Sequence, residues 1–362
     1  MEAQEHLRKH VVHMRLSWGQ QPLGLIDSNR DMTTRLIGLL PNLKTLHLLP
    51  GHLYFSHTSL TQISALHLCM PFRDRATVSD FEGLFRHNPH LSNLVITATQ
   101  SWASDDHLSV PQAGSDDIRL MSLVAHMSIY STVCCANTMK NLLRAPKTLV
   151  SLHYHYNGDA APNRNAIMPT NFPYNLKYHE ASLEELVVHA HPHQHIPLQH
   201  PIGRVMQTLE HFTALKRLGL PAWWMVHPAT DEAKLYTEGD TNTRKLVEML
   251  PSKLEILQIQ SSELHFVCGR QARITHCSWV ESVTAQCARF LAWLREIADY
   301  KASHIPALKK VTVWSSIARL PEEEEMNRKS GVSQAFSDVD VELDFTVCRP
   351  ESTALFGINM RF

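Results

Sequence analysis

A short aliphatic pattern, L-x-x-L-x-L with Ile and Val substitutions, returns along the chain and constrains its fold more than any other feature. Aliphatic residues at the fourth and sixth places give the alternation of a short strand that buries one face. On the order of four such triples would arise at random in a chain so rich in Leu, Ile and Val, so a single copy carries little weight. We predict strands near residues 11–16, 43–48, 63–68, 91–96, 149–154, 183–188, 215–220, 254–259, 308–313 and 339–345.

The segments that precede the pattern share a second feature. A helix-like run comes first and a proline follows it, as in LIGLLPNLKTL, NLLRAPKTLVSL and LVEMLPSKLEIL. Proline lacks a backbone donor and disfavours helix in the residue before it, so it ends the helix. We expect the strand to begin about two residues after the proline. Random triples would not share this punctuation.

Helix and strand in turn, repeated along a chain, are typical of leucine-rich repeats. Neither element is stable alone, and stacked neighbours close a common core. We therefore expect an α/β fold: an irregular leucine-rich-repeat solenoid, or horseshoe, with a parallel sheet on the concave face and helices on the convex face. Residues 1–362 would form it as a single degenerate domain.

The intervals between repeats are irregular, and the long ones are expected to hold additional helices or loops. Amphipathic spacing predicts a helix at 279–300, and a less regular one at 118–144 that would bury Cys134 and Cys135. Loops are expected at 99–117, 157–181, 189–202 and 226–243, where Gly, Pro, Ser, Asp and His gather.

Composition excludes several classes of protein. The net charge is -1, with 34 basic and 35 acidic residues, which argues against a non-specific nucleic-acid binder and against a polybasic membrane-surface protein. No apolar run reaches the length of a membrane-spanning helix, and the first ten residues lack the apolar core of a signal peptide. We expect a cytoplasmic or nuclear protein whose seven cysteines are free thiols.

The helix–proline–strand units, the segment LVEMLPSKLEILQI and the closing AFSDVDVELDF resemble the leucine-rich-repeat region of filamentous-fungal F-box-type proteins. The resemblance covers about residues 11–347 and implies a role in recognising substrates for a ubiquitin ligase. Members of that family often carry an N-terminal F-box, which docks on the Skp1 adaptor. A repeat strand is expected here from Val11, so we expect no F-box, and a Skp1-type partner only if an F-box lies upstream.

The residues that alternate with the aliphatic ones would point out of the concave sheet. His47, His67 and His153 occupy the same place in their repeats, and strands about 4.8 Å apart would make His47 and His67 neighbours. Such a face is open to three interpretations: a neutral surface that tolerates histidine, a partner-binding surface, or a metal site or pH switch. The predicted partner-binding residues are His47, His67, His153, His155, Glu185, His189, Arg217, Gln258, Lys310 and Trp314.

The segment HAHPHQHIPLQH, residues 189–200, is rich in histidine, but its alternation turns side chains to opposite sides and no Cys, Asp or Glu completes a site. We therefore predict no metal site and no cofactor, with His189, His191, His193 and His195 as weak candidates. The chain has no GxxxxGK[ST], HExxH or GxSxG motif, so we do not expect an enzyme. The hypotheses are a protein-interaction module, a structural or decayed repeat protein without a specific ligand, and a protein that binds metal through the histidine loop.

Overall fold

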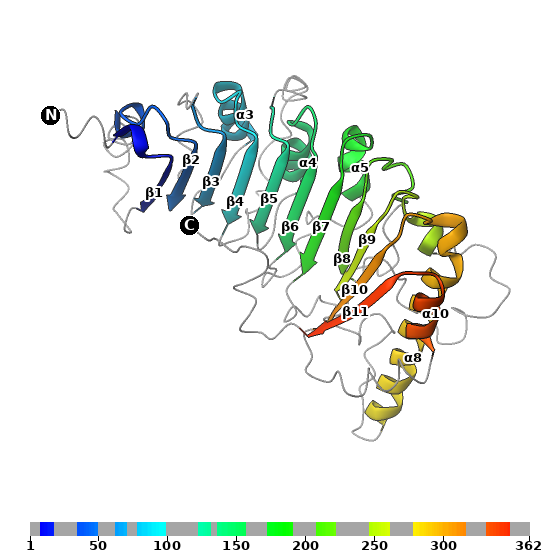
Figure 1. Cartoon of the computed structure of the whole chain (residues 1–362). Coiled ribbons are helices and arrows are strands. Elements are labelled where there is room, and N and C mark those ends of the chain that lie inside the picture. Colours follow the sequence, from blue (N-terminus) through cyan, green and yellow to red (C-terminus); the bar gives the residue numbers. More distant parts are fainter. Residues whose placement is uncertain are drawn as a thin grey trace. The chain divides into compact units, whose positions relative to one another are not determined.

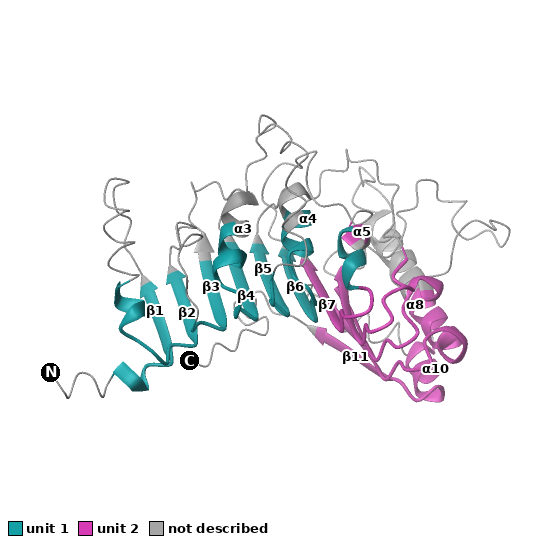
Figure 2. Cartoon of the chain, turned by 90° about the horizontal axis from the view of Figure 1, so that it is seen from above, with its two compact units in different colours: residues 1–167, 175–179 teal, residues 168–174, 180–362 magenta. Residues whose placement is uncertain are grey.

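A computed structural model describes residues 8–17, 35–49, 62–70, 78–98, 122–131, 136–156, 172–190, 208–221, 246–260, 278–315 and 331–347, and the statements below concern these residues. The chain divides into two compact units, shown in different colours in Figure 2. Unit 1 comprises residues 1–167 and 175–179, and unit 2 comprises residues 168–174 and 180–362. Each unit is described by itself.

Unit 1 contains six parallel strands that pair in sequence order (Figure 1). They are β1 (His13–Ser17), β2 (Thr45–Leu49), β3 (Ala65–Met70), β4 (Asn93–Ala98), β5 (His126–Ser131) and β6 (Ser151–Tyr156). Helix α3 (Val78–His87) precedes β4, and α4 (Ala136–Arg144) precedes β6. The short helices α5 (Phe172–Leu176) and η4 (Lys177–His179) follow β6 in the chain, and unit 1 includes them from Asn175 on.

Unit 2 contains five parallel strands, again paired in sequence order. They are β7 (Glu185–Ala190), β8 (Arg217–Pro221), β9 (Ile256–Gln260), β10 (Lys310–Ser315) and β11 (Glu342–Val347). The 3-10 helix η5 (Leu246–Met249) precedes β9, the long helix α8 (Ser278–His304) precedes β10, and α10 (Val332–Asp338) precedes β11. Helix α8 packs against both η5 and α10. The α/β class and the parallel strands are thus confirmed.

The aliphatic pattern builds the core of each unit. The side chains at its first, fourth and sixth places are 2% exposed or less from β2 to β10, which confirms that these residues face the interior. In unit 1 the three rows run through Leu43, Ile63, Leu91, Val124 and Leu149; through Leu46, Leu66, Leu94, Met127 and Leu152; and through Leu48, Leu68, Ile96, Ile129 and Tyr154. In unit 2 they run through Leu183, Leu215, Leu254 and Leu308; through Leu186, Leu218, Leu257 and Val311; and through Val188, Leu220, Ile259 and Val313.

A repeated hydrogen-bond pattern sets the register at the start of each strand. The carbonyl oxygen of Lys44 accepts hydrogen bonds from the backbone N–H groups of Ser64 and Ala65, both at 3.0 Å. The carbonyl of Ser64 accepts in the same way from Ser92 and Asn93, at 2.9 and 3.0 Å. Carbonyls of Val12, Ser92, Ala125, Glu184, Lys216 and Glu255 each accept from two successive N–H groups of the next repeat as well. One carbonyl therefore aligns each strand with its neighbour.

All ten predicted strands are present, but nine of them begin two residues later than predicted, and β11 begins three residues later. In the copies from β2 to β10 the first aliphatic residue precedes the strand and buries its side chain there. For the same reason the spacing from the proline is longer than expected. β2 starts four residues after Pro41 and β9 starts five residues after Pro251.

Strand β5 corrects the prediction of a helix over 118–144. Residues His126–Ser131 form a strand, and among the described residues of this range the helix is confined to Ala136–Arg144. Val124, Met127 and Ile129 fill the three buried places of the repeat, with Met in the place where Leu is usual. The long interval before β6 therefore contains a complete repeat. A short apolar run cannot be assigned to strand or helix by periodicity alone.

Other predicted segments are confirmed in part. Helix α8 covers the predicted 279–300, and Leu291, Leu294, Ile297 and Ala298 of its predicted face are buried. The predicted loop 157–181 is wrong where α5 and η4 form, and the loop 189–202 is wrong at its start because β7 extends to Ala190. The predicted loops 99–117 and 226–243, Cys134 and Cys135 lie outside the described residues.

Candidate functional site

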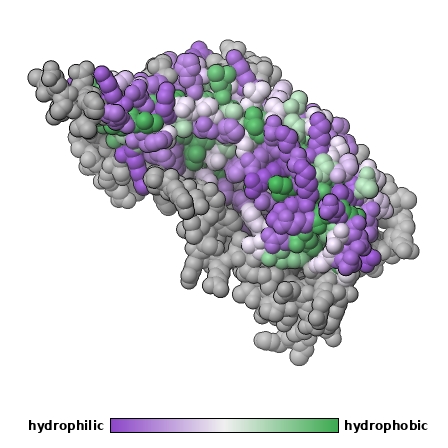
Figure 3. Space-filling view, viewed as in Figure 1, coloured by the Kyte–Doolittle hydropathy of each residue, from purple (hydrophilic) through white to green (hydrophobic). Residues whose placement is uncertain are grey.

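The candidate site is the outer face of each sheet, formed by the side chains that alternate with the buried rows. All ten predicted partner-binding residues lie on strands at these alternating places. Unit 1 carries His47, His67, His153 and His155, and unit 2 carries Glu185, His189, Arg217, Gln258, Lys310 and Trp314. Figure 3 shows a face of the molecule on which hydrophilic residues predominate and hydrophobic residues appear in small separate patches.

Two histidines of unit 1 meet nitrogen to nitrogen. His47 and His67 are partners in the β2–β3 register, and their Nδ1 atoms lie 3.1 Å apart. The ring centroids are 5.2 Å apart with the planes at 71°. The Nε2 atom of His67 lies 3.0 Å from the hydroxyl oxygen of Thr97 on β4. The prediction that His47 and His67 are neighbours is confirmed. The contact of His67 with Thr97 was not predicted.

Burial keeps this pair neutral. It is the main reason that the pKa of His67 is lowered to about 4, and the neighbouring His47 and Arg15 lower it further. Burial also lowers the pKa of His47, with smaller contributions from Arg15 and His13. A neutral imidazole keeps a lone pair on one ring nitrogen, so the pair can accept a hydrogen bond or bind a metal ion.

A second ring contact of unit 1 joins β5 to β6. Tyr130 and His155 are register partners, and their rings stack with centroids 4.2 Å apart and planes at 17°. Burial, and to a lesser extent His153, lowers the pKa of His155 to about 4. Burial raises the pKa of the Tyr130 hydroxyl. Tyr130 was not predicted because its strand was read as a helix.

In unit 2 the outer face brings together two predicted residues that the sequence does not place side by side. His189 of β7 and Trp314 of β10 stack with centroids 5.2 Å apart and planes at 5°, although β8 and β9 lie between their strands. Pro221 and Gln260, which share a register row with Trp314 on the two intervening strands, are buried. The two rings therefore reach across a compact middle of the sheet.

The middle of this face is closely packed around Gly219. A Cβ atom at Gly219 would lie 3.1 Å from Val187 Cγ1 and 3.3 Å from Gln258 Oε1, which is tighter than ordinary contact. Gln258 is only 8% exposed, and within the described residues its Oε1 accepts no hydrogen bond. A buried amide oxygen without a donor costs free energy, so this acceptor is available to a donor that reaches it.

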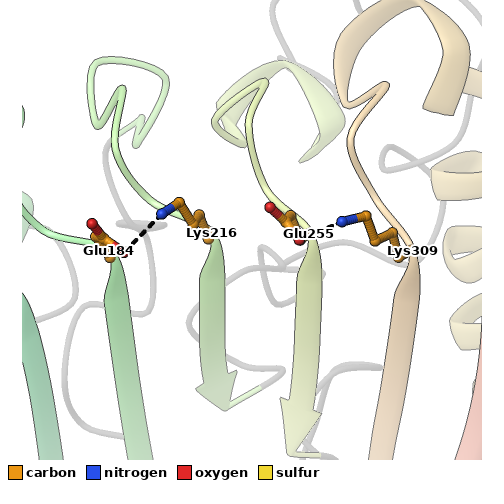
Figure 4. A network of polar contacts seen from close by, with 4 residues as sticks. All are labelled: Glu184, Lys216, Glu255 and Lys309. Atoms are coloured by element: carbon orange, nitrogen blue, oxygen red, sulfur yellow. Dashed lines mark hydrogen bonds and ion pairs between the residues drawn. The ribbon is translucent and has the colours of Figure 1, made fainter.

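Ion pairs line the start of the strands in unit 2 (Figure 4). Lys216 Nζ lies 2.8 Å from Glu184 Oε2, and Lys309 Nζ lies 2.6 Å from Glu255 Oε2. The hydrogen bond that Lys216 donates to Glu184 raises the pKa of Lys216, and the hydrogen bond that Glu255 accepts from Lys309 lowers the pKa of Glu255. The sequence analysis missed this row, although a signal was present: the second place of four successive repeats alternates Glu, Lys, Glu, Lys.

The predicted charged residues form a second row on the outer face itself. Arg217 Nη1 lies 3.0 Å from Glu185 Oε1, and these two residues are register partners. Lys310 Nζ lies 2.6 Å from Glu342 Oε1, which raises the pKa of Lys310, and 4.0 Å from Asp344 Oδ2. These charges on the outer face are therefore paired across strands.

Among the described residues there is no group of three or more His, Cys, Asp and Glu side chains that could hold a metal ion. His189 lies on β7, whereas His191, His193 and His195 are outside the described part of the chain. No described helix is both long and apolar enough to cross a membrane.

Comparison with known proteins leaves the family open. No protein-family model matches the chain, and no curated protein sequence is significantly similar to it.

Proposed function

We propose that the chain is a non-enzymatic protein-interaction module, a degenerate leucine-rich-repeat solenoid whose outer sheet face binds another protein. Three features of the described residues support the repeat class: parallel strands in sequence order, three continuous aliphatic rows, and one carbonyl that aligns each strand with the next. Stacked units of this kind present extended sheet surfaces that partners can contact.

The stack of His189 on Trp314 carries the binding proposal. Both rings are partly exposed on a face where Val187, Gln258 and Thr312 are buried and the charges of Glu185, Arg217 and Lys310 are paired. Tryptophan and arginine are enriched among the residues that dominate binding energy at protein interfaces. A ring already held parallel to its neighbour loses little freedom when a partner packs on it. Arg217 lies two strands from Trp314 on the same face.

The resemblance to F-box-type proteins extends the proposal to substrate recognition in a ubiquitin ligase. In that arrangement the repeat region holds the substrate, and a Skp1-type adaptor binds through an F-box. The ligase role predicts that Skp1 and a cullin accompany the chain. This prediction can fail while the proposal that the outer face binds a protein still holds.

Affinity capture from a filamentous-fungal lysate tests both levels. The full chain carries a tag without histidine and is compared with Trp314→Ala and with the control Tyr178→Ala, which removes a ring that is 41% exposed elsewhere. We expect a reproducible partner that Trp314→Ala loses and Tyr178→Ala retains. Equal recovery by all three proteins, or no specific partner, would contradict the proposed face. Recovery of Skp1 and a cullin with the partner would support the ligase role, and a partner without them would remove it.

A further inference from the structure

The contact between His47 and His67 has the dimensions of a metal-ligand pair. Metal–imidazole bonds are about 2.0 to 2.1 Å long. Two nitrogens bound to one ion are then about 2.9 Å apart at a right angle and about 3.3 Å apart at a tetrahedral angle. The observed separation of the two Nδ1 atoms, 3.1 Å, lies between these values. Both atoms can enter one coordination sphere once each ring turns so that its lone pair points to the ion rather than to the other nitrogen.

Thr97 orients one of the two rings. The Nε2 atom of His67 lies 3.0 Å from the Thr97 hydroxyl oxygen, on the next strand. When Nε2–H donates to this oxygen, Nδ1 of His67 carries the lone pair that faces His47. Histidine ligands of metal ions are commonly held in this way by a hydrogen bond from the second ring nitrogen.

The side chains around His47 and His67 determine which class of metal ion the pair can bind. The described outer face of unit 1 carries histidines, Arg15 and neutral side chains, but no Asp or Glu. Calcium and magnesium require oxygen ligands, whereas imidazole nitrogen suits copper, nickel and zinc, with copper(II) bound most strongly. Arg15, the register partner of His47, adds a positive charge that weakens the binding of any cation. Two protein ligands leave further positions of the ion to water, so the site would be labile.

We propose that His47 and His67 form a two-histidine site for a divalent transition-metal ion, copper(II) above zinc(II). The site is independent of the partner-binding proposal, which rests on unit 2. In the absence of metal the same two nitrogens share a hydrogen bond, so the pair does not require the ion in order to fold.

Copper(II) titration of the untagged full chain tests the site. His191→Ala, His193→Ala and His195→Ala are introduced in every protein, so that the histidine loop cannot bind the probe. Binding is followed by calorimetry and by the nitrogen hyperfine splitting of the copper resonance. We expect one copper with two imidazole nitrogens, lost in His47→Ala and in His67→Ala, and retained in His126→Ala, a histidine of the same face on β5.

Two further variants separate metal binding from a purely structural hydrogen bond. His47→Gln keeps a side chain that can hydrogen-bond to His67 but binds copper poorly, so it should retain the melting temperature and lose the copper. Thr97→Val keeps both ligands and should weaken binding about tenfold. Unchanged stoichiometry and affinity in His47→Gln and His67→Ala would overturn the proposal, as would a copper signal that only His126→Ala removes.

Discussion

The Nε2 atom of His179 donates a hydrogen bond to the carbonyl oxygen of Leu143 at 2.6 Å. Its Nδ1 atom accepts a second hydrogen bond from the backbone N–H of Leu149 at 3.3 Å. The side chain is fully buried in unit 1, and burial lowers its pKa, although the bond to Leu143 opposes the shift. His179 is a neutral crosslink that ties η4 to the end of α4 and to the turn before β6.

His179→Ala should destabilise unit 1 by about 2 to 4 kcal/mol, because it leaves a buried N–H and a buried carbonyl unpaired and opens a cavity. Chemical denaturation measures this change. Lys147→Ala, at an exposed position of the same turn, is the control and should change the free energy of unfolding by less than about 0.5 kcal/mol. Equal effects of the two substitutions would contradict the proposed crosslink.

Leu218→Asp should unfold unit 2 or cost it about 4 kcal/mol or more, because Leu218 is 0% exposed in the central buried row. Circular dichroism and thermal melting follow the loss. Thr213→Asp introduces the same carboxylate at an exposed position just before the strand and should be tolerated. A soluble Leu218→Asp protein with unchanged melting would show that the strand register is wrong.

Stability should fall as the pH decreases from about 6.5 to about 4, partly because of His155. The folded state holds His155 neutral down to about pH 4, whereas the unfolded chain takes up the proton near the ordinary value of 6.5. The unfolded state therefore binds more protons in this window, and acid favours it. The contribution of this one group is on the order of 2 to 3 kcal/mol.

His155→Phe keeps a ring against Tyr130 and cannot be protonated, so its free energy of unfolding should fall less steeply over the same pH window. Denaturation at a series of pH values provides the measurement. Tyr130→Phe keeps the stack and the histidine, and should retain the full acid dependence. If the free energy of unfolding falls with decreasing pH equally steeply in His155→Phe and in the unaltered chain, His155 does not contribute to the acid dependence.

The row of Glu184, Lys216, Glu255 and Lys309 should make stability depend on salt. Lys216→Glu places a third carboxylate between Glu184 and Glu255, and should lower the melting temperature by about 2 °C at low ionic strength. At about 1 M NaCl the screening length falls to about 3 Å and the difference should largely vanish. Adding Glu184→Lys to Lys216→Glu restores an opposite pair of charges at positions 184 and 216 but leaves carboxylates at 216 and 255 side by side, so it should recover only part of the loss. A difference that persists at high salt would point to a cause other than charge.

The buried half of each strand could be predicted because alternation at period two requires only the order of residue types. Leu46, Leu218 and Leu257 are inside for that reason. Strand β5 was missed because the run around Met127 also fits a helix. Helix α10 was missed because its seven residues, Val332–Asp338, give too few turns for a helical pattern to stand out.

The residues of the candidate site could be predicted from the sequence, but most of the contacts between them could not. Strand spacing was enough to place His47 beside His67. It could not place His189 against Trp314, because that contact depends on how far two long side chains lean across the intervening β8 and β9. His179 lies outside the aliphatic strand pattern, and its role depends on two backbone groups whose positions the sequence does not indicate.

The shared carbonyl at the start of each strand has a consequence for how such a chain can change in evolution. The register of each such strand is set at one point, so it does not depend on the length of the segment that connects it to the strand before. The starts of β2 and β3 are 20 residues apart (Thr45 to Ala65), and those of β9 and β10 are 54 apart (Ile256 to Lys310), with the same alignment in both cases. Codons can therefore be gained or lost between strands while the set of outward side chains stays in place. The codons for the strands and the codons for the connecting segments can then diverge at different rates.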